Sequence, residues 1–147
     1  MLCNLKSLYR GIKLKMAVTR NVGLAAFMVN YEIENPGAKI AVMPWGGSKG
    51  TVLEAYRQLR DEGVDIGWIY SMTLNPLPKP IEDQLSTTDL VIVPELNYQG
   101  QWSRLLRSDG YRATSITQYT GLPFKVGFLV EEIKQAIEAH KGGKVLV

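Results

Sequence analysis

The sequence predicts a three-layer α/β domain around a mainly parallel β-sheet. Two observations lead to this class. Short apolar runs alternate along the chain with amphipathic segments, which is the order of strands and helices in α/β proteins. The clearest stretch covers residues 39–78, where an apolar run, a glycine-rich turn, an amphipathic segment and a second apolar run follow one another. A strand–helix–strand unit of this kind pairs its strands in parallel.

The first elements each have their own sequence signal. Residues 24–33 predict a short strand or entry segment, which ends at the Asn-Pro-Gly turn of residues 35–37. Residues 39–45 form a near-continuous apolar run, as in strands that are covered on both faces. Residues 51–60 place their apolar side chains along one helical stripe, and Gly63 is a typical residue to end that helix.

The later elements follow the same alternation. A strand over residues 64–72 leads into the loop from Asn75 to Pro80, whose three prolines argue against helix and central strand. The next signals predict a short helix over residues 81–85, a buried strand over 90–96 and a helix over 101–107. A weaker strand near a sheet edge follows over 111–119, and a last helix over 130–138 ends before the glycine pair 142–143.

Length and composition fit one domain. The chain has 147 residues, of which 46% are apolar and 21% charged, as in ordinary soluble globular proteins. We expect residues 27–147 to form this domain and residues 1–26 to be a basic, poorly ordered N-terminal segment. Apolar stretches stay well below the roughly 18 residues of a membrane span. Because the N-terminal segment has no continuous apolar core and Cys3 is the only cysteine, we expect a cytoplasmic protein.

The distribution of charge argues against a nucleic-acid partner. Residues 1–38 carry five Lys or Arg side chains against two Glu, whereas residues 39–147 carry twelve of each sign. The net charge of +3 therefore lies in the N-terminal quarter, and the predicted domain is electrically balanced. A nucleic-acid-binding domain would carry a clustered basic face of its own.

A glycine-rich turn between the first strand and helix of the unit is one candidate site. Its spacing fits neither the P-loop nor the dinucleotide-binding pattern. Two interpretations remain open. The loop can contact an anion through backbone N–H groups and a lysine, or it can be a tight packing turn in which Ser48 caps the helix. The candidate residues are Gly46, Gly47, Ser48, Lys49 and Gly50.

A second strand-to-helix loop should lie at the same end of a parallel sheet. Its polar residues can meet whatever docks there, or they can cap and turn the chain locally. Trp102 starts the following helix and is a candidate for an exposed interface anchor, whereas Trp45 and Trp68 are expected to pack at the sheet. The candidate residues are Glu95, Asn97, Gly100, Gln101 and Trp102.

No residue pattern supports catalysis or metal binding. His140 is the only histidine and sits at the end of the last helix, where a solvent-facing role is expected. Neither a Gly-x-Ser-x-Gly elbow nor a histidine–cysteine cluster can be assembled. We therefore predict no catalytic and no metal residue, and a stand-alone hydrolase or transferase has the least support.

The order of the motifs resembles domain II of the alpha subunit of 2-oxoacid:ferredoxin oxidoreductases. The resemblance covers about residues 30–140 and is carried by three marks: Trp45-Gly46 with Ser48-Lys49-Gly50, the loop from Thr73-Leu74 to Pro76-Leu77-Pro78, and Glu95-x-Asn97 with Gly100-Gln101. The same domain type is similar to the C-terminal domain of transketolase-like enzymes. It implies a Rossmann-like, mostly parallel five-stranded sheet whose first strand, residues 27–33, is antiparallel.

The resemblance also implies a function for a larger complex. The whole enzyme would convert a 2-oxoacid and coenzyme A to acyl-CoA and CO2, with thiamine diphosphate, Mg2+ and iron–sulfur clusters, and would reduce ferredoxin. The expected partners are a pyrimidine-binding domain and a thiamine diphosphate-binding beta subunit. We expect this chain to bind no cofactor alone, to be inactive in isolation, and to position its neighbours through subunit interfaces. The alternative is a free-standing module that binds a small anion or nucleotide at residues 46–50.

Overall fold

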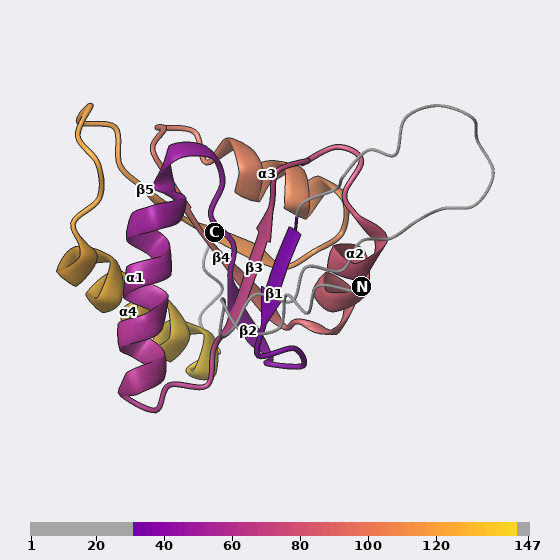
Figure 1. Ribbon diagram of the computed structural model, residues 1–147, viewed down its shortest axis with the longest axis horizontal. Coiled ribbons are helices and arrows are strands. Elements are labelled where there is room, and N and C mark those ends of the chain that lie inside the picture. Colours follow the sequence, from indigo (N-terminus) through magenta and orange to yellow (C-terminus); the bar gives the residue numbers. More distant parts are fainter. Residues whose placement is uncertain (1–30, 144–147) are drawn as a thin grey trace, which may run out of the picture.

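The computed structural model describes residues 31–143 and places a β-sheet between two layers of helices (Figure 1). The expected segment 1–26, and most of the first expected strand, lie outside the described residues. The order of strands across the sheet is β1-β3-β2-β4-β5. β1 pairs with β3 in the antiparallel direction, and every other pairing is parallel. The strands are β1 (Tyr31–Glu34), β2 (Ile40–Val42), β3 (Gly67–Ser71), β4 (Leu90–Glu95) and β5 (Ala113–Thr117).

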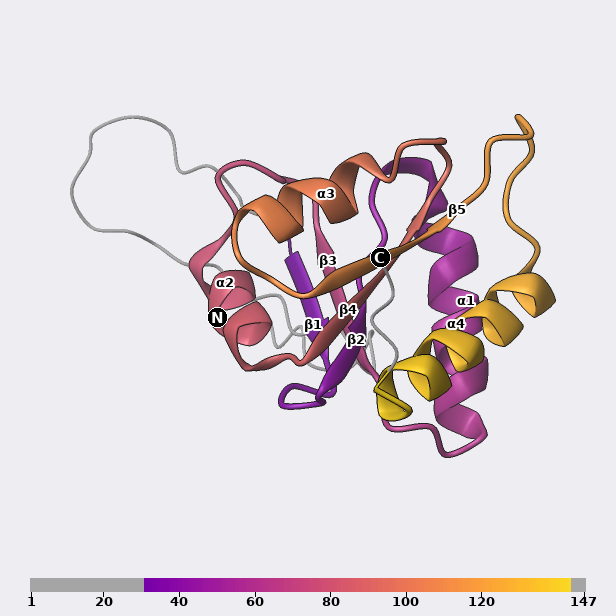
Figure 2. The ribbon, with the colours of Figure 1, turned by 180° about the vertical axis from the view of Figure 1, so that it is seen from behind.

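The helices cover both faces of this sheet. Figures 1 and 2 show α1 and α4 on one face and α2 and α3 on the other. The described chain therefore has the predicted three-layer α/β/α arrangement, with β5 at a sheet edge as expected. The helices are α1 (Lys49–Asp61), α2 (Lys79–Thr87), α3 (Gln101–Ser108) and α4 (Val126–Lys141), with a short 3-10 turn, η2 (Gly46–Ser48), before α1.

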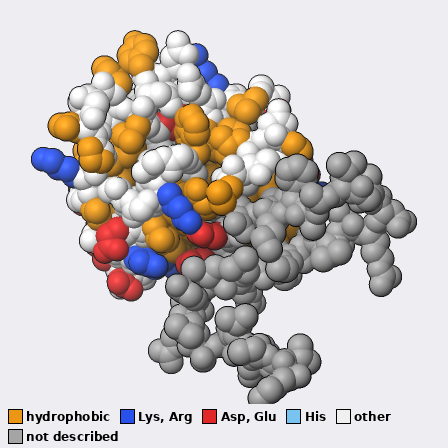
Figure 3. All heavy atoms as spheres, turned by 45° about the horizontal axis from the view of Figure 1, so that its top comes forward, with side chains coloured by type: hydrophobic (Ala, Val, Ile, Leu, Met, Phe, Trp, Pro, Cys, Tyr) orange, Lys and Arg blue, Asp and Glu red, His pale blue; other side chains and the backbone are white. Residues whose placement is uncertain are grey.

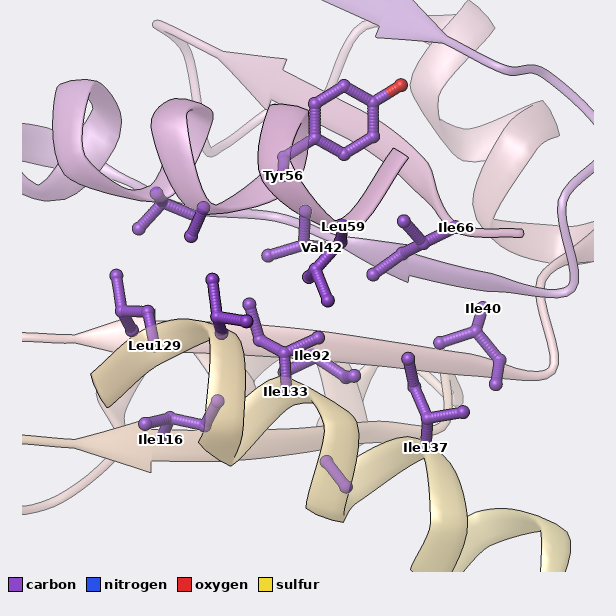
Figure 4. Close-up of a cluster of buried hydrophobic side chains, with 14 of the residues drawn as sticks. Ile40, Val42, Tyr56, Leu59, Ile66, Ile92, Ile116, Leu129, Ile133 and Ile137 are labelled. Atoms are coloured by element: carbon purple, nitrogen blue, oxygen red, sulfur yellow. The ribbon is translucent and has the colours of Figure 1, made fainter. Parts of the chain in front are cut away.

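The two faces of the sheet hold separate hydrophobic clusters. Val42 and Ile92 point toward α1 and α4, whereas their neighbours Met43 and Val93 point toward α2 and α3. β2 and β4 are thus buried on both faces, which explains why their sequences are almost continuously apolar. Figure 4 shows Ile133 of α4 among the side chains of the cluster between the sheet and the helices α1 and α4. Complete burial of such a side chain contributes about 1.5–3 kcal/mol to the stability of the fold.

The predicted end of the loop before α2 was wrong. The prolines of residues 75–80 were expected to exclude helix, yet α2 begins at Lys79 and includes Pro80 in its first turn. A proline is tolerated there because the N–H groups of the first turn have no partner within the helix. In the part of the chain that is described, no helix has the length and apolar character needed to cross a membrane.

Candidate functional site at the carboxyl end of the sheet

The two predicted loops lie together at one end of the molecule. β2 and β4 are parallel neighbours, with Val42 beside Ile92, so the loops that follow them leave the sheet at the same edge. The Trp45 side chain crosses from the first loop to the second, where its Nε1 donates a hydrogen bond of 3.2 Å to Glu95 Oε2. The predicted juxtaposition is confirmed.

Glu95 holds this end of the sheet together. Its side chain is 0% exposed, although it is a carboxylate at the end of a strand. Besides Trp45, three N–H donors reach it: the backbone N–H of Trp102 at 2.8 Å, that of Ser103 at 3.0 Å, and the Asn97 amide at 2.9 Å. The first two are unpaired donors of the first turn of α3. Glu95 therefore caps α3 from outside the helix, where a negative charge is also favoured by the helix dipole.

The remaining polar residues of the second loop shape its turn. Asn97 Oδ1 accepts hydrogen bonds from the backbone N–H groups of Gly100, at 2.7 Å, and Gln101, at 3.3 Å. Gly100 adopts a φ of +61°, which favours glycine. A Cβ at this position would also lie 2.9 Å from Ser115 Oγ. Asn97 and Gly100 thus follow the local turning interpretation.

The first loop agrees only in part with the packing-turn interpretation. Ser48 is the N-cap residue of α1, as that interpretation expected, but its side chain makes no capping hydrogen bond. Its hydroxyl instead donates to the carbonyl oxygen of Trp45, at 2.9 Å, with the carbonyl of Pro94 at 3.4 Å. The 3-10 turn over Gly46–Ser48 brings the Ser48 side chain inward, so it ties the loop to β4 instead of closing the helix end.

Lys49 points its charge at the sheet. Its Nζ lies 2.6 Å from Glu32 Oε1 and 4.2 Å from the centre of the Tyr70 ring. Glu32 in turn accepts a hydrogen bond of 3.1 Å from Trp68 Nε1. An anion at the glycine loop would have to compete with this half-buried pair, which weakens the anion-binding interpretation.

Trp102 does not serve as an exposed anchor. The expectation of exposure was wrong, because the side chain is 2% exposed and packs in the cluster under α2 and α3. Among the described residues, no partner accepts a hydrogen bond from its Nε1. The exposed aromatic residues of this end are Tyr98 and Tyr119, which sequence reasoning did not select. Their rings meet edge to face with centres 5.0 Å apart.

A pocket of about 250 Å³ lies between the two loops. Its lining carries indole, hydroxyl and amide groups for hydrogen bonding and no charged side chain. The lining residues are Trp45, Gly46, Gly47, Ser48, Leu96, Asn97 and Gln101. His140 is remote, because it lines a separate hollow at the amino ends of the strands. Within residues 31–143, no group of His, Cys, Asp and Glu side chains could hold a metal ion. The groups that line the pocket between the two loops can form hydrogen bonds and apolar contacts.

No protein-family model matches the chain, but sequence comparison finds relatives of one enzyme class. The 2-oxoglutarate oxidoreductase subunit KorA of Mycobacterium tuberculosis is 32% identical over 117 residues, which are 78% of this chain and 17% of the relative. The 2-oxoacid:ferredoxin oxidoreductase subunit alpha of Saccharolobus solfataricus is 31% identical over 77% of this chain and 18% of its own. The chain thus spans less than a fifth of these curated relatives.

Solved structures agree with the sequence comparison. The 2-oxoglutarate:ferredoxin oxidoreductase of Magnetococcus marinus, solved with 2-oxoglutarate, coenzyme A and succinyl-CoA, matches with a TM-score of 0.66 and 34% identity. That match covers 74% of this chain and 20% of the other. The alpha chain of a probable 2-oxoacid ferredoxin oxidoreductase from Thermoplasma acidophilum matches with a TM-score of 0.50 and 24% identity, over 74% of this chain and 97% of that chain. At this level of identity the match supports the fold alone.

Proposed function

We propose that this chain, a homologue of one segment of the alpha subunits of 2-oxoacid:ferredoxin oxidoreductases, is a packing and positioning component of such an enzyme. The complete enzyme would convert a 2-oxoacid and coenzyme A to acyl-CoA and CO2 and pass the electrons to ferredoxin. The similarity to alpha subunits over more than three quarters of the chain carries the proposal. Its partners would be the pyrimidine-binding domain and the thiamine diphosphate-binding beta subunit.

The chemistry of the candidate site supports a role in contact. The buried carboxylate of Glu95 accepts from four donors, so it is not available as a general base. The cation of the glycine loop, Lys49, is paired with Glu32. Mg2+ that accompanies a diphosphate usually takes one or two carboxylate ligands, and no carboxylate lines the pocket between the two loops. Thiamine diphosphate would be held by other parts of the complex, and so would the iron–sulfur clusters, because a cluster takes four ligands, mostly cysteines, and this chain has only Cys3.

Reconstitution tests this proposal. The chain is purified alone and also co-expressed with the polypeptides that supply the rest of the oxidoreductase, and reduction of ferredoxin is followed with 2-oxoglutarate and coenzyme A. We expect no turnover by the isolated chain, co-purification with its partners, and activity of the assembly only when this chain is present. Turnover by the chain alone, or an assembly that is equally active without it, would contradict the proposal.

The anion-binding alternative is tested separately. Inorganic phosphate and ATP are titrated against the isolated chain while its thermal midpoint is followed, with Lys49→Ala as the comparison. The proposed packing role predicts no shift of the midpoint beyond the general effect of salt. A saturable shift that Lys49→Ala abolishes would instead favour a small-anion module at residues 46–50.

A further inference from the structure

The loops at the carboxyl end of the sheet carry almost no charge. Each loop follows one of the parallel strands, and they comprise residues 45–48, 72–78, 96–101 and 118–124, here called the uncharged end. None of these 24 residues is Asp, Glu, Lys, Arg or His, and Lys125, directly before α4, is the single charged residue of the four strand-to-helix connections. With 21% charged residues in the chain, about five would be expected in 24. Figure 3, which turns this end toward the viewer, shows hydrophobic and uncharged atoms dominating the upper part of the view.

This end also holds most of the exposed large apolar side chains. Of the seven in residues 31–143, five belong to its loops: Met72, Leu96, Tyr98, Tyr119 and Leu122. Tyr98 is 73% exposed, and Tyr119 and Leu122 are each 67% exposed. Loops in contact with water normally carry polar and charged residues, so this many exposed apolar side chains without a charge need a different explanation.

The uncharged end has a groove and a pocket in addition to its exposed apolar side chains. The edge-to-face contact of Tyr98 and Tyr119 joins two of the loops and restricts both rings. A groove of about 480 Å³ lies at the last loop, and four apolar residues and three polar or charged ones line it: Leu122, Pro123, Phe124, Phe128, Gln118, Thr120 and Lys125. The pocket between the first and third loops measures about 250 Å³, below the roughly 300–1,000 Å³ of typical small-molecule sites. A hollow of this size suits one inserted side chain.

The opposite end of the sheet provides the contrast. The hollow at the amino ends of the strands is lined mainly by ionisable side chains of both signs: Lys39, Glu62, Asp65, Asp89, Lys134, Glu138, His140 and Lys141. That composition is typical of surface that stays in water. Depletion of charge together with enrichment in tyrosine and other aromatic residues is instead the mark of the core of a protein–protein interface.

We infer that the uncharged end is the docking face of this chain for the remainder of the alpha subunit, whose contact surface is itself apolar and poor in charge. Nucleic acid and anionic lipid are recognised by clusters of Lys and Arg, whereas the four connections contain the single cation of Lys125. Because the relatives carry this segment as less than a fifth of a longer subunit, the other four-fifths are available to cover it. The inference rests on the proposed function. It adds residues 72–78 and 118–124 to the two loops of the candidate site as part of the contact surface.

Charge insertion tests the inference. Tyr98→Lys and Leu122→Lys place a cation on the uncharged end, whereas Gln58→Lys on α1 and Gln135→Lys on α4 place it at exposed positions elsewhere. Binding of each purified full-length variant to the polypeptide with the remaining alpha-subunit segments is measured by biolayer interferometry. We expect at least a tenfold loss of affinity for the first two variants and less than a twofold change for the controls. Circular dichroism and thermal midpoints establish that all four are folded.

The outcomes separate the two proposals. If the unmodified chain binds and all four variants bind equally well, the docking face is wrong while the proposed function stands. If the unmodified chain does not bind at all, the proposed function fails and this inference fails with it. If light scattering shows that the chain alone forms a dimer, and Leu122→Lys makes it monomeric, the occupant is a second copy and the assignment to the alpha subunit is overturned.

Discussion

Glu95 is the residue on which the candidate site depends most. A carboxylate with no exposure is stabilised only when its oxygens are fully hydrogen-bonded, and here four N–H groups satisfy them. These donors come from the β2–α1 loop, the β4–α3 loop and the first turn of α3. One side chain therefore fixes the position of two loops and one helix relative to the sheet.

Replacing this carboxylate by an amide is expected to destabilise the fold. In Glu95→Gln one acceptor oxygen becomes an NH2 group, which would face N–H donors of Trp45, Trp102 or Ser103. We expect a loss of about 2–3 kcal/mol in the free energy of unfolding, measured by urea denaturation. The exposed Glu54→Gln on α1 is the matched control and should change it by less than about 0.5 kcal/mol. Equal effects of the two substitutions would contradict the role given to Glu95.

Tyr56 gives the protein a stability term that is lost in alkali. Burial, together with the nearby Glu34 carboxylate, raises the pKa of Tyr56 from 10.0 to about 12. Figure 4 shows its hydroxyl at the edge of the α1 and α4 cluster. Since the pKa in the folded state is the higher one, the neutral phenol favours folding below pH 10. That contribution is lost as the pH rises from 10 toward 12.

The expected result is a steeper alkaline loss of stability in the native chain than in Tyr56→Phe. Between pH 9 and pH 11 the difference in unfolding free energy between the two proteins should shrink by roughly 1 kcal/mol, measured by urea denaturation at each pH. Each protein's own value at pH 8 serves as its reference, so the packing effect of the substitution cancels. If the unfolding free energies of the two proteins stay parallel as functions of pH up to pH 11, Tyr56 ionises at its ordinary pKa.

Residues with local roles could be predicted from the sequence, and residues with distant partners could not. A turning role for Asn97 and Gly100 was one of the two interpretations left open, because an Asn and a Gly between a strand and a helix act within a few positions. The pairing of Lys49 with Glu32 and of Trp45 with Glu95 joins residues 17 and 50 positions apart. Trp102 was misjudged because its position at a helix start does not say which face of the helix meets the sheet.

At the scale of elements, α3 shows how a helix can begin without a side-chain cap of its own. Its N-cap residue is Gly100, in a left-handed conformation, and the helix is closed by Glu95 from the preceding strand. This arrangement requires the chain to turn sharply between Glu95 and Gln101. The lack of a side chain at Gly100 allows that turn to lie against Ser115 of β5.

Two glycine substitutions should therefore have opposite effects. Gly100→Ala forces a Cβ into a positive φ and within 2.9 Å of Ser115 Oγ, and we expect a loss of about 1–2 kcal/mol or more. Gly127→Ala in the first turn of α4 meets no atom within 4 Å and should stabilise the fold by up to about 1 kcal/mol. Thermal and urea unfolding measure both changes. A neutral Gly100→Ala would show that this turn does not need glycine.

The extents of elements were less predictable than their order. The alternation of helices and strands was read correctly over the described chain, because hydrophobic periodicity reports burial directly. Only three residues of the run 39–45 form β2, namely Ile40–Val42. Met43 still donates a backbone hydrogen bond of 2.9 Å to the Ile92 carbonyl oxygen, and the two residues after it are buried or half-buried. The run 111–119 likewise contains only Ala113–Thr117 of β5.

At the scale of the molecule, charge is divided between the two ends of the sheet. The amino ends of the strands are bordered by ionisable side chains of both signs, whereas the carboxyl ends lead into the four loops of the uncharged end. The net charge of the chain does not reveal this division, because the charges of residues 39–147 cancel. It becomes visible only when the topology places the loops side by side.

This division predicts how binding to the rest of the alpha subunit responds to salt. An interface without charged groups has little Coulomb attraction to screen, so its affinity should change less than about twofold between 50 and 500 mM NaCl. Its apolar contacts should instead give a negative heat-capacity change of binding. Isothermal titration calorimetry at both salt concentrations and at several temperatures measures both quantities. A tenfold weakening in high salt would place charged side chains at the interface, and the docking face would then lie outside the four loops.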